Sequence, residues 1–322
     1  MRLNGNGHCT RALEEALEGM SLKERIGAAM ERHGKTQGQV AREAGMSETT
    51  LSQWRNGTYR GSAENVEQKL ESWLRAAEEA RVTQQLVPDA PAFYLSRTAD
   101  EIMAAFRYAQ SIEDMVAVVG APGIGKTTTC QEYQRQYPNV WLATLASHTT
   151  GLVPVLAEIR DAVSGGPANG GPAFAREICR KIRKTGGLLM VDEAHHASID
   201  ALDAIRSLHD TTHTAIALLG GVELMAKLEK MPQLYSRLGL RLRRPRVLAA
   251  DINALLDAWE INAAPERRAV TEVAKGPGGL RTATKVLRLA TASARAAGEK
   301  LTLHQIQDAA HARGARVAEE VG

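Results

Sequence analysis

The sequence predicts a parallel α/β core between two all-helical segments. In the middle of the chain, short apolar runs over residues 116–119, 139–145, 187–193 and 214–221 alternate with helical stretches. Such alternation is typical of a parallel sheet whose strands are joined by helices. Before and after this region the apolar residues recur every three or four positions, which predicts helices alone. A chain of 322 residues is long enough for two or three domains.

The composition is that of a globular protein that binds no membrane. The chain is 44% apolar and 24% charged, and no apolar run approaches the roughly 20 residues of a membrane helix. The first twenty residues carry charges but no apolar stretch of the secretory kind. The three cysteines, Cys9, Cys130 and Cys179, form no C-x-x-C pair, so we expect reduced thiols in a cytoplasm.

The chain divides into five expected segments. They are a disordered extension over 1–19, a helix-turn-helix domain over 20–81, a linker over 82–96, a nucleotide-binding core over 97–248 and a helical domain over 249–322. Pro88 and Pro91 mark the linker, because proline breaks helices and stiffens the chain. The extension is rich in Gly, Asn and Glu, and both Met1 and Met20 are possible translation starts.

The strand over 116–119 leads into Gly120-x-x-x-x-Gly125-Lys126-Thr127, the Walker A spacing. Glycines let backbone N–H groups curl around a phosphate, and the following helix directs its positive end at the anion. Lys126 is expected to bind the β- and γ-phosphates and Thr127 a Mg²⁺ ion. The expected nucleotide ligands are Gly120, Ala121, Pro122, Gly123, Ile124, Gly125, Lys126, Thr127 and Thr128.

The apolar run over 187–193 ends in Asp192 and Glu193, the Walker B pattern. A strand buried on both faces is apolar throughout, and its carboxyl end faces the ligand crevice. We expect Asp192 to hold Mg²⁺ and Glu193 to polarise the attacking water. His195 and His196 are interpreted as surface positions at a helix start. Arg97 and Thr98 are weak candidates for the base side, although a surface helix start is the simpler interpretation.

The segment over 36–57 has the offsets of a helix-turn-helix of the phage-repressor type. Thr36 and Ser47 are helix caps, Ala41 is small where the two helices cross, and Gly45 tolerates the turn. The second helix would expose Thr49, Gln53 and Arg55 to DNA. The alternative is a helical bundle for protein contact, because residues 20–81 carry ten Lys/Arg against nine Asp/Glu.

Positive charge gathers in the last third of the chain. Residues 235–322 hold fifteen Lys/Arg and nine Asp/Glu, and five of the arginines lie within 237–246. Arg243 and Arg244 are candidates for phosphate-backbone contact, with a solvated face as the alternative. Lys285 and Arg288 share one helix face with Arg281 and could also bind DNA. The expected helices cover 251–259, 265–274, 283–297 and 303–318.

The order of these motifs resembles that of AAA+ ATPases. The resemblance implies that Arg237, in Leu234-Tyr-Ser-Arg237, is an arginine finger that reaches a neighbouring subunit's nucleotide. It also implies that Arg281 senses the γ-phosphate from a lid helix. The family usually ends the strand over 214–221 with a polar sensor. Here that strand ends in Gly220-Gly221, so the sensor is missing, and Glu223 or a backbone group are the substitutes to consider.

From Met20 on, nearly the whole chain resembles the phage Mu-type transposition protein B family. The specific likeness lies in Asp257-Ala-Trp-Glu-Ile-Asn262 and Pro277-Gly-Gly-Leu-Arg281. It implies an α/β P-loop AAA+ core with a parallel sheet, an amino-terminal all-α helix-turn-helix domain and a carboxyl-terminal all-α lid that also binds DNA. ATP and Mg²⁺ are the implied cofactors.

The same resemblance implies the partners. ATP-bound subunits of this family form a helical filament on double-stranded DNA with little sequence preference, in the bacterial host cytoplasm. The filament presents target DNA to a transposase, and hydrolysis dissolves it. Two alternatives stay open, namely a helper ATPase of another element or a helicase loader, and an ATP-switched helix-turn-helix repressor.

Overall fold

The computed structural model describes residues 20–88, 90–91, 93–165 and 174–315. They fall into two compact units. One contains the residues up to Pro88 together with 291–301, and the other contains 89–290 and the residues from Thr302 on. The expected extension over 1–19 lies outside the described residues. None of the described helices combines the length and the apolar character that a membrane crossing needs.

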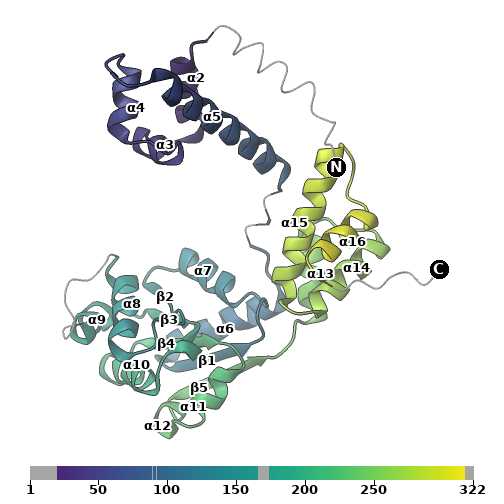
Figure 1. Cartoon of the computed structure of the whole chain (residues 1–322). Coiled ribbons are helices and arrows are strands. Elements are labelled where there is room, and N and C mark those ends of the chain that lie inside the picture. The colour runs from purple at the N-terminus through teal and green to yellow at the C-terminus, as the bar shows by residue number, and fades with distance from the viewer. Residues whose placement is uncertain (1–19, 89, 92, 166–173, 316–322) are drawn as a thin grey trace. The chain divides into compact units, whose positions relative to one another are not determined.

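The core is a five-stranded parallel sheet in the order β2-β3-β4-β1-β5 (Figure 1). The strands are β1 (Met115–Gly120), β2 (Val140–Thr144), β3 (Leu188–Asp192), β4 (Ala215–Gly220) and β5 (Leu238–Arg244). The four predicted strands are confirmed. The fifth strand, β5, was not predicted, and it pairs with β1 at the edge of the sheet.

The arginines of β5 explain that error. Leu238, Leu240 and Leu242 alternate with glycine and arginine, which is the period of a strand. The density of charge led us to treat 237–246 as a basic surface run instead. Arg241 and Arg243 are exposed along β5, because one face of an edge strand is open to solvent.

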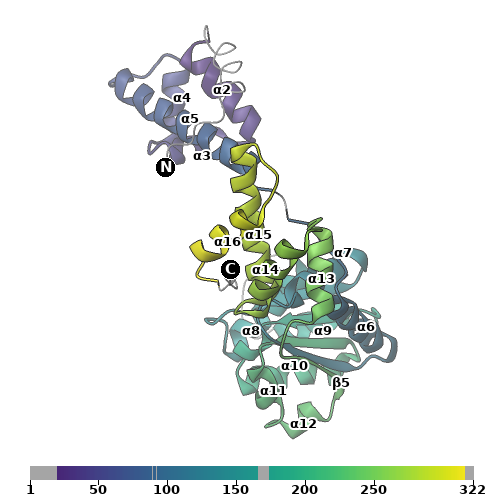
Figure 2. The same cartoon turned by 90° about the vertical axis from the view of Figure 1, so that its right-hand side faces the viewer.

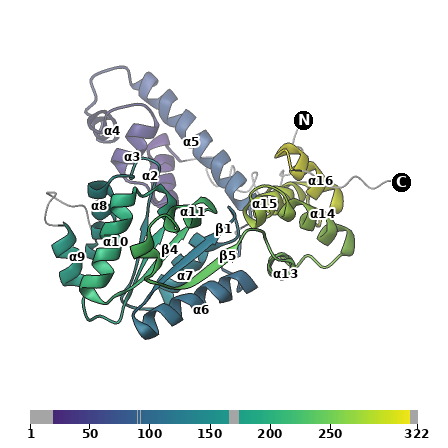
Figure 3. The same cartoon turned by 90° about the horizontal axis from the view of Figure 1, so that it is seen from below.

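Helices cover both faces of the sheet (Figure 3). On β1, Met115, Ala117 and Val119 face one apolar core, whereas Val116 and Val118 face the other. The first core is completed by α8 (Leu152–Ser164), α9 (Phe174–Ile182), α10 (Ile199–Thr212), α11 (Glu223–Leu228) and α12 (Pro232–Tyr235). The second is completed by α6 (Arg97–Ile112) and α7 (Lys126–Gln136). This strict alternation fixes the sheet's register and therefore which residues stand at its carboxyl edge.

The amino-terminal unit contains the predicted helix-turn-helix. Its helices are α2 (Leu22–His33), α3 (Gln37–Glu43), α4 (Glu48–Arg55) and α5 (Ala63–Leu86). Thr36 and Ser47 cap α3 and α4 as expected, and Gly45 adopts φ +66° in the turn. Leu51 and Trp54 are buried with Val40 and Ala41. The helix α5 runs five residues past the expected boundary at 81, because no glycine or proline interrupts it before Pro88.

Four helices form the carboxyl-terminal lid (Figure 2). They are α13 (Ala249–Ala258), α14 (Ala264–Lys275), α15 (Gly279–Ala297) and α16 (Leu303–Ala312). A buried carboxylate, Asp251, fastens the lid to the core. It accepts hydrogen bonds from the Thr98 amide (2.8 Å) and the Thr98 hydroxyl (2.6 Å), so α13 is tied to the start of α6.

Candidate nucleotide-binding site

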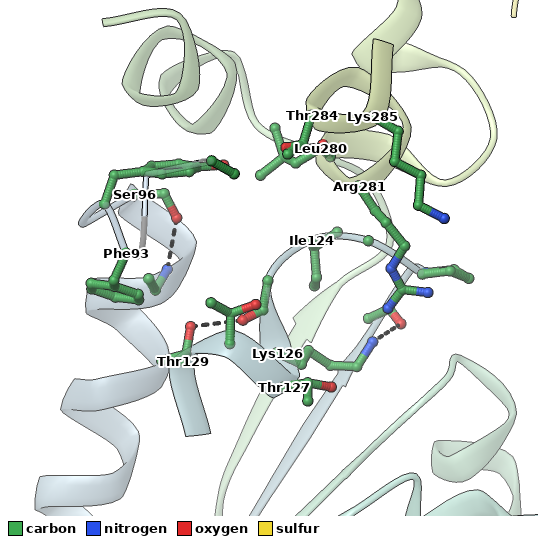
Figure 4. Close-up of a pocket in the computed structure, with 18 of the residues that line it drawn as sticks. Phe93, Ser96, Ile124, Lys126, Thr127, Thr129, Leu280, Arg281, Thr284 and Lys285 are labelled. Atoms are coloured by element: carbon green, nitrogen blue, oxygen red, sulfur yellow. Dashed lines mark hydrogen bonds between the residues drawn. The ribbon is translucent and has the colours of Figure 1, made fainter. Parts of the chain in front are cut away.

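A cavity of about 790 Å³ lies between the carboxyl edge of the sheet and the first turns of α15 (Figure 4). Its floor is the loop between β1 and α7. Gly123 and Gly125 adopt φ +78° and +100°, conformations that side chains rarely tolerate. A Cβ on Gly123 would lie 1.9 Å from the Gly278 carbonyl oxygen. The loop can therefore approach the lid only because residue 123 is glycine.

Lys126 points along this loop. Only 8% of the residue is exposed, and its ammonium donates hydrogen bonds to the carbonyls of Gly120 (2.8 Å) and Ala121 (3.1 Å). Burial lowers the pKa of Lys126, and the nearby carboxylates of Glu193 and Asp192 oppose that shift. The two carbonyls thus hold the Lys126 ammonium against the loop between β1 and α7.

Thr127 and Asp192 meet at one point, although they are 65 residues apart. The Thr127 hydroxyl donates to Asp192 Oδ2 over 2.5 Å, and the Asp192 carboxylate is fully buried. The Glu193 amide donates to the other oxygen, Asp192 Oδ1, over 2.9 Å. A hydroxyl and a carboxylate are hard oxygen ligands of the kind that Mg²⁺ prefers beside a phosphate, so the predicted pair fits that ion.

Glu193, His195 and His196 follow β3 and line the cavity. Glu193 adopts φ +54°, and the short 3₁₀ turn Ala194–His196 follows it. His195 lines the cavity with its side chain only 17% exposed, so our interpretation of it as a surface position was wrong. Its ring lies near Glu193, Gly221 and Glu223. These groups converge because β3 and β4 are neighbours in the sheet.

Aromatic residues line the other end of the cavity. Phe93, Tyr94 and Trp259 come from the segment before α6 and from the end of α13. Burial, together with the Asp251 carboxylate, raises the pKa of Tyr94 to about 12, so its hydroxyl stays protonated. Arg97 and Thr98 were only weak candidates for the base side. Neither of them lines the cavity, and the Thr98 hydroxyl is occupied by Asp251. The missed signal was the aromatic pair just after the prolines of the linker.

The lid contributes cations to this cavity. Arg281 extends from α15 toward the phosphate loop (Figure 4). Lys285 and Arg288, which were candidates for DNA contact, also line the cavity. All three stand on one face of α15, because they are spaced by four and three residues.

Arg237, the predicted finger, stands elsewhere. It follows α12, and its guanidinium donates to Asp210 Oδ1 over 2.9 Å while 48% of its side chain is exposed. This hydrogen bond holds the pKa of Asp210 below its usual value. Arg237 does not line the cavity of its own chain.

The candidates for DNA contact differ in their exposure and in the ion pairs and hydrogen bonds that their side chains form. Arg243 is exposed, whereas Arg244 forms an ion pair with Glu101 on α6. On α4, Thr49, Gln53 and Arg55 are exposed. The Arg55 guanidinium also donates to Gln37 Oε1 over 3.1 Å.

Comparisons with known proteins match three families along the chain. The AAA domain family matches residues 110–228, the family "Mu B transposition protein, C terminal" matches 236–312 and a helix-turn-helix family matches 26–68. The solved structure of Cdc6p from Pyrobaculum aerophilum shares the fold, with a TM-score of 0.55 and 13% identity over 71% of this chain and 70% of that one.

Two curated relatives are closer in sequence. The ATP-dependent target DNA activator B of Escherichia phage Mu is 31% identical over 84% of this chain and 88% of its own length. The Mu-like prophage FluMu DNA transposition protein B of Haemophilus influenzae is 32% identical over 78% of this chain and 89% of its own length. The chain therefore belongs to the Mu B transposition protein family, the ATP-dependent target DNA activators.

Proposed function

We propose that this protein is an ATPase that assembles on target DNA while it holds ATP and delivers that DNA to a transposase. The observation that carries the proposal is the convergence of Lys126, the Thr127–Asp192 pair, Glu193 and Arg281 on one cavity. In a member of the Mu B family, this set matches what phosphoryl transfer to water requires.

Different residues interact with different parts of the bound ATP. The backbone N–H groups around Gly123 and Gly125 cradle the phosphates, and Lys126 compensates their charge. Thr127 and Asp192 would hold Mg²⁺, which would supply positive charge beside the phosphates. Glu193 accepts hydrogen bonding from the attacking water and directs it at the γ-phosphorus. The aromatic end of the cavity, with Phe93 and Tyr94, suits the flat face of the base.

Two arginines respond to the γ-phosphate in this proposal. Arg281 acts within its own subunit, because it already lines the cavity. Arg237 acts on the nucleotide of the next subunit, because its exposed position lies outside its own cavity. Hydrolysis therefore requires an assembly of subunits, which is how ATP and DNA binding become coupled.

The structure offers one further basic surface for duplex DNA. On α9 and the turn after it, Arg176, Arg180, Arg183 and Lys184 are exposed. Arg176 and Arg180 stand on one face of α9, because they are four residues apart. They line a groove of about 650 Å³ together with the hydroxyls of Ser207 and Thr211 on α10. Within the described residues none of the four forms an ion pair. Such a cluster of cations suits phosphate contact without sequence reading, as do Arg243 and the lid cations.

Binding to random-sequence duplexes of increasing length, with an ATP analogue or with ADP, tests this proposal. We expect ATP-dependent binding that strengthens with length and weakens with salt. Lys126→Ala should lose nucleotide and DNA binding together, whereas Glu193→Gln should bind ATP and stay on DNA. Tight, ATP-independent protection of one palindromic site would instead support the repressor alternative.

The same assay separates the candidate DNA surfaces. Replacing Arg176, Arg180 and Arg183 by alanine should lower the slope of log affinity against log salt by about 3. Arg55→Ala and Arg243→Ala are the matched variants for α4 and β5. An unchanged slope in the α9 variant would remove that helix from the DNA-binding surface.

A further inference from the structure

The end of β4 carries no side chain, and the side chains of neighbouring residues occupy the space beside it. A Cβ on Gly220 would lie 2.9 Å from Leu224 and 3.2 Å from His195 Nδ1. A Cβ on Gly221 would lie 2.3 Å from the Glu223 carboxylate. The space beside the bare strand end is therefore filled by the side chains of His195 and Glu223.

The His195 ring is held rigidly at that place. It belongs to the 3₁₀ turn Ala194–His196, and the Lys227 ammonium donates to the carbonyls of His195 (2.6 Å) and Ala197 (2.8 Å). The ring also packs on that of His196, with centroids 4.1 Å apart. A ring anchored on both its backbone and its face has few alternative positions.

The contacts of the ring nitrogens compete with one another. Nε2 lies 3.3 Å from Glu223 Oε1. Nδ1 faces two groups of opposite kind, the Gly221 N–H at 3.3 Å and Glu193 Oε2 at 3.3 Å. A nitrogen that carries a lone pair accepts from the amide and repels the carboxylate. A nitrogen that carries a proton binds the carboxylate and leaves the amide without this partner.

The neutral ring with its proton on Nε2 satisfies more of these contacts. It donates to Glu223, accepts from Gly221 and turns a lone pair toward Glu193. With the proton on Nδ1 instead, the neutral ring binds Glu193 but turns a lone pair toward the Glu223 carboxylate. The first arrangement leaves Glu193 free for water, and the second ties it to the ring.

We propose that His195 is a positioning residue, which joins the bare end of β4 to Glu223 and sets whether Glu193 faces the attacking water. It thereby takes the place of the polar side chain that β4 lacks. This inference rests on the proposed function, in which Glu193 polarises the water. His195 itself exchanges no proton with the substrate, and no bond forms or breaks at its ring.

Steady-state ATP hydrolysis by the full chain on DNA, together with ATP affinity, tests the role of His195. We expect His195→Ala to lower kcat about tenfold or more while ATP affinity changes less than about twofold. His195→Asn should recover part of kcat, because its amide oxygen stands near Nδ1 and can accept from Gly221. His195→Gln, whose amide lies nearer to Nε2, should recover less. His304→Ala is the control and should hydrolyse ATP as the wild type does, because its side chain on α16 is 82% exposed and lies outside the cavity.

A second measurement asks whether His195 acts through Glu193. In a Glu193→Gln background, His195→Ala should lower kcat by less than about twofold further, since the group it positions is gone. An undiminished tenfold loss in that background would overturn the proposal, as would an unchanged kcat in His195→Ala alone. A Glu193→Gln variant that hydrolyses ATP as fast as the wild type would instead refute the underlying function. Retained ATP affinity in His195→Asn shows that folding does not explain a loss.

Discussion

Arg281 and Arg237 stand in opposite relations to the nucleotide cavity. Arg281 projects into it from the first turn of α15, close enough that its charge helps burial to lower the pKa of Lys126. Arg237 lies outside the cavity and is held by Asp210, which also accepts from Arg206 over 2.5 Å. The difference separates what one subunit supplies from what a neighbour must supply. We therefore expect Arg281 to act on its own nucleotide and Arg237 on another's.

The largest expected effect is that of Arg237→Ala. An arginine that stabilises the transferring phosphoryl group contributes about 10³-fold or more to kcat, so we expect a loss of that order with ATP affinity retained. DNA-stimulated phosphate release measures it. Arg246→Ala, an exposed arginine of the same basic run, is the control. If both variants lose the same small fraction of the hydrolysis rate, Arg237 acts only as a surface charge.

Arg281→Ala should have the next largest effect. Removing one preorganised donor from a charged site costs about 10²-fold, and here the loss should include weaker ATP binding because Arg281 lines the cavity. Titration with a fluorescent ATP analogue measures the affinity, and phosphate release the rate. If the variant loses affinity for ATP and for ADP by the same factor, Arg281 has no role at the γ-phosphate.

Gly123→Ala tests what places Arg281 over the phosphate loop. The new Cβ would collide with the Gly278 carbonyl just before α15, so the lid must move away from the loop. We expect about tenfold weaker ATP binding, which corresponds to ~1.4 kcal/mol. Gly165→Ala is a matched control, because Gly165 adopts a similar φ of +75° and no described residue lies within 4 Å of its added Cβ. Similar ATP affinities in the two variants would show that the lid contact is unimportant.

The smallest expected effect is that of Asp210→Asn, which weakens the ion pair that holds Arg237. An exposed ion pair contributes about 1 kcal/mol or less, so we expect kcat on DNA to rise by less than about threefold, and more at low salt. Asp203→Asn is the control, because Asp203 pairs with Arg206 but not with Arg237. A fall in kcat would mean that Asp210 orients Arg237 for its task.

Local patterns in the sequence predicted much of this fold. The apolar runs located four strands, and the spacing of Gly120, Lys126 and Thr127 located the phosphate loop. The caps Thr36 and Ser47 located the helix-turn-helix. These features depend on neighbours in sequence, for which periodicity and residue type are direct signals.

The features that were missed depend on contacts between distant segments. Arg244 pairs with Glu101, which is 143 residues away, and only the pairing of β5 with β1 brings them together. His195 faces Gly221 because β3 and β4 are neighbours in the sheet. No local pattern in the sequence predicts either contact. The charge of β5 also masked its alternation of leucines.

Mixing two inactive variants tests the central claim most directly. Glu193→Gln subunits bind ATP and present Arg237, while Arg237→Ala subunits keep an intact Glu193. If the finger acts between subunits, an equal mixture on DNA should recover about a quarter of the wild-type hydrolysis rate, since about one interface in four then pairs an intact Glu193 with an intact Arg237. A mixture no more active than the average of its two components would contradict the account.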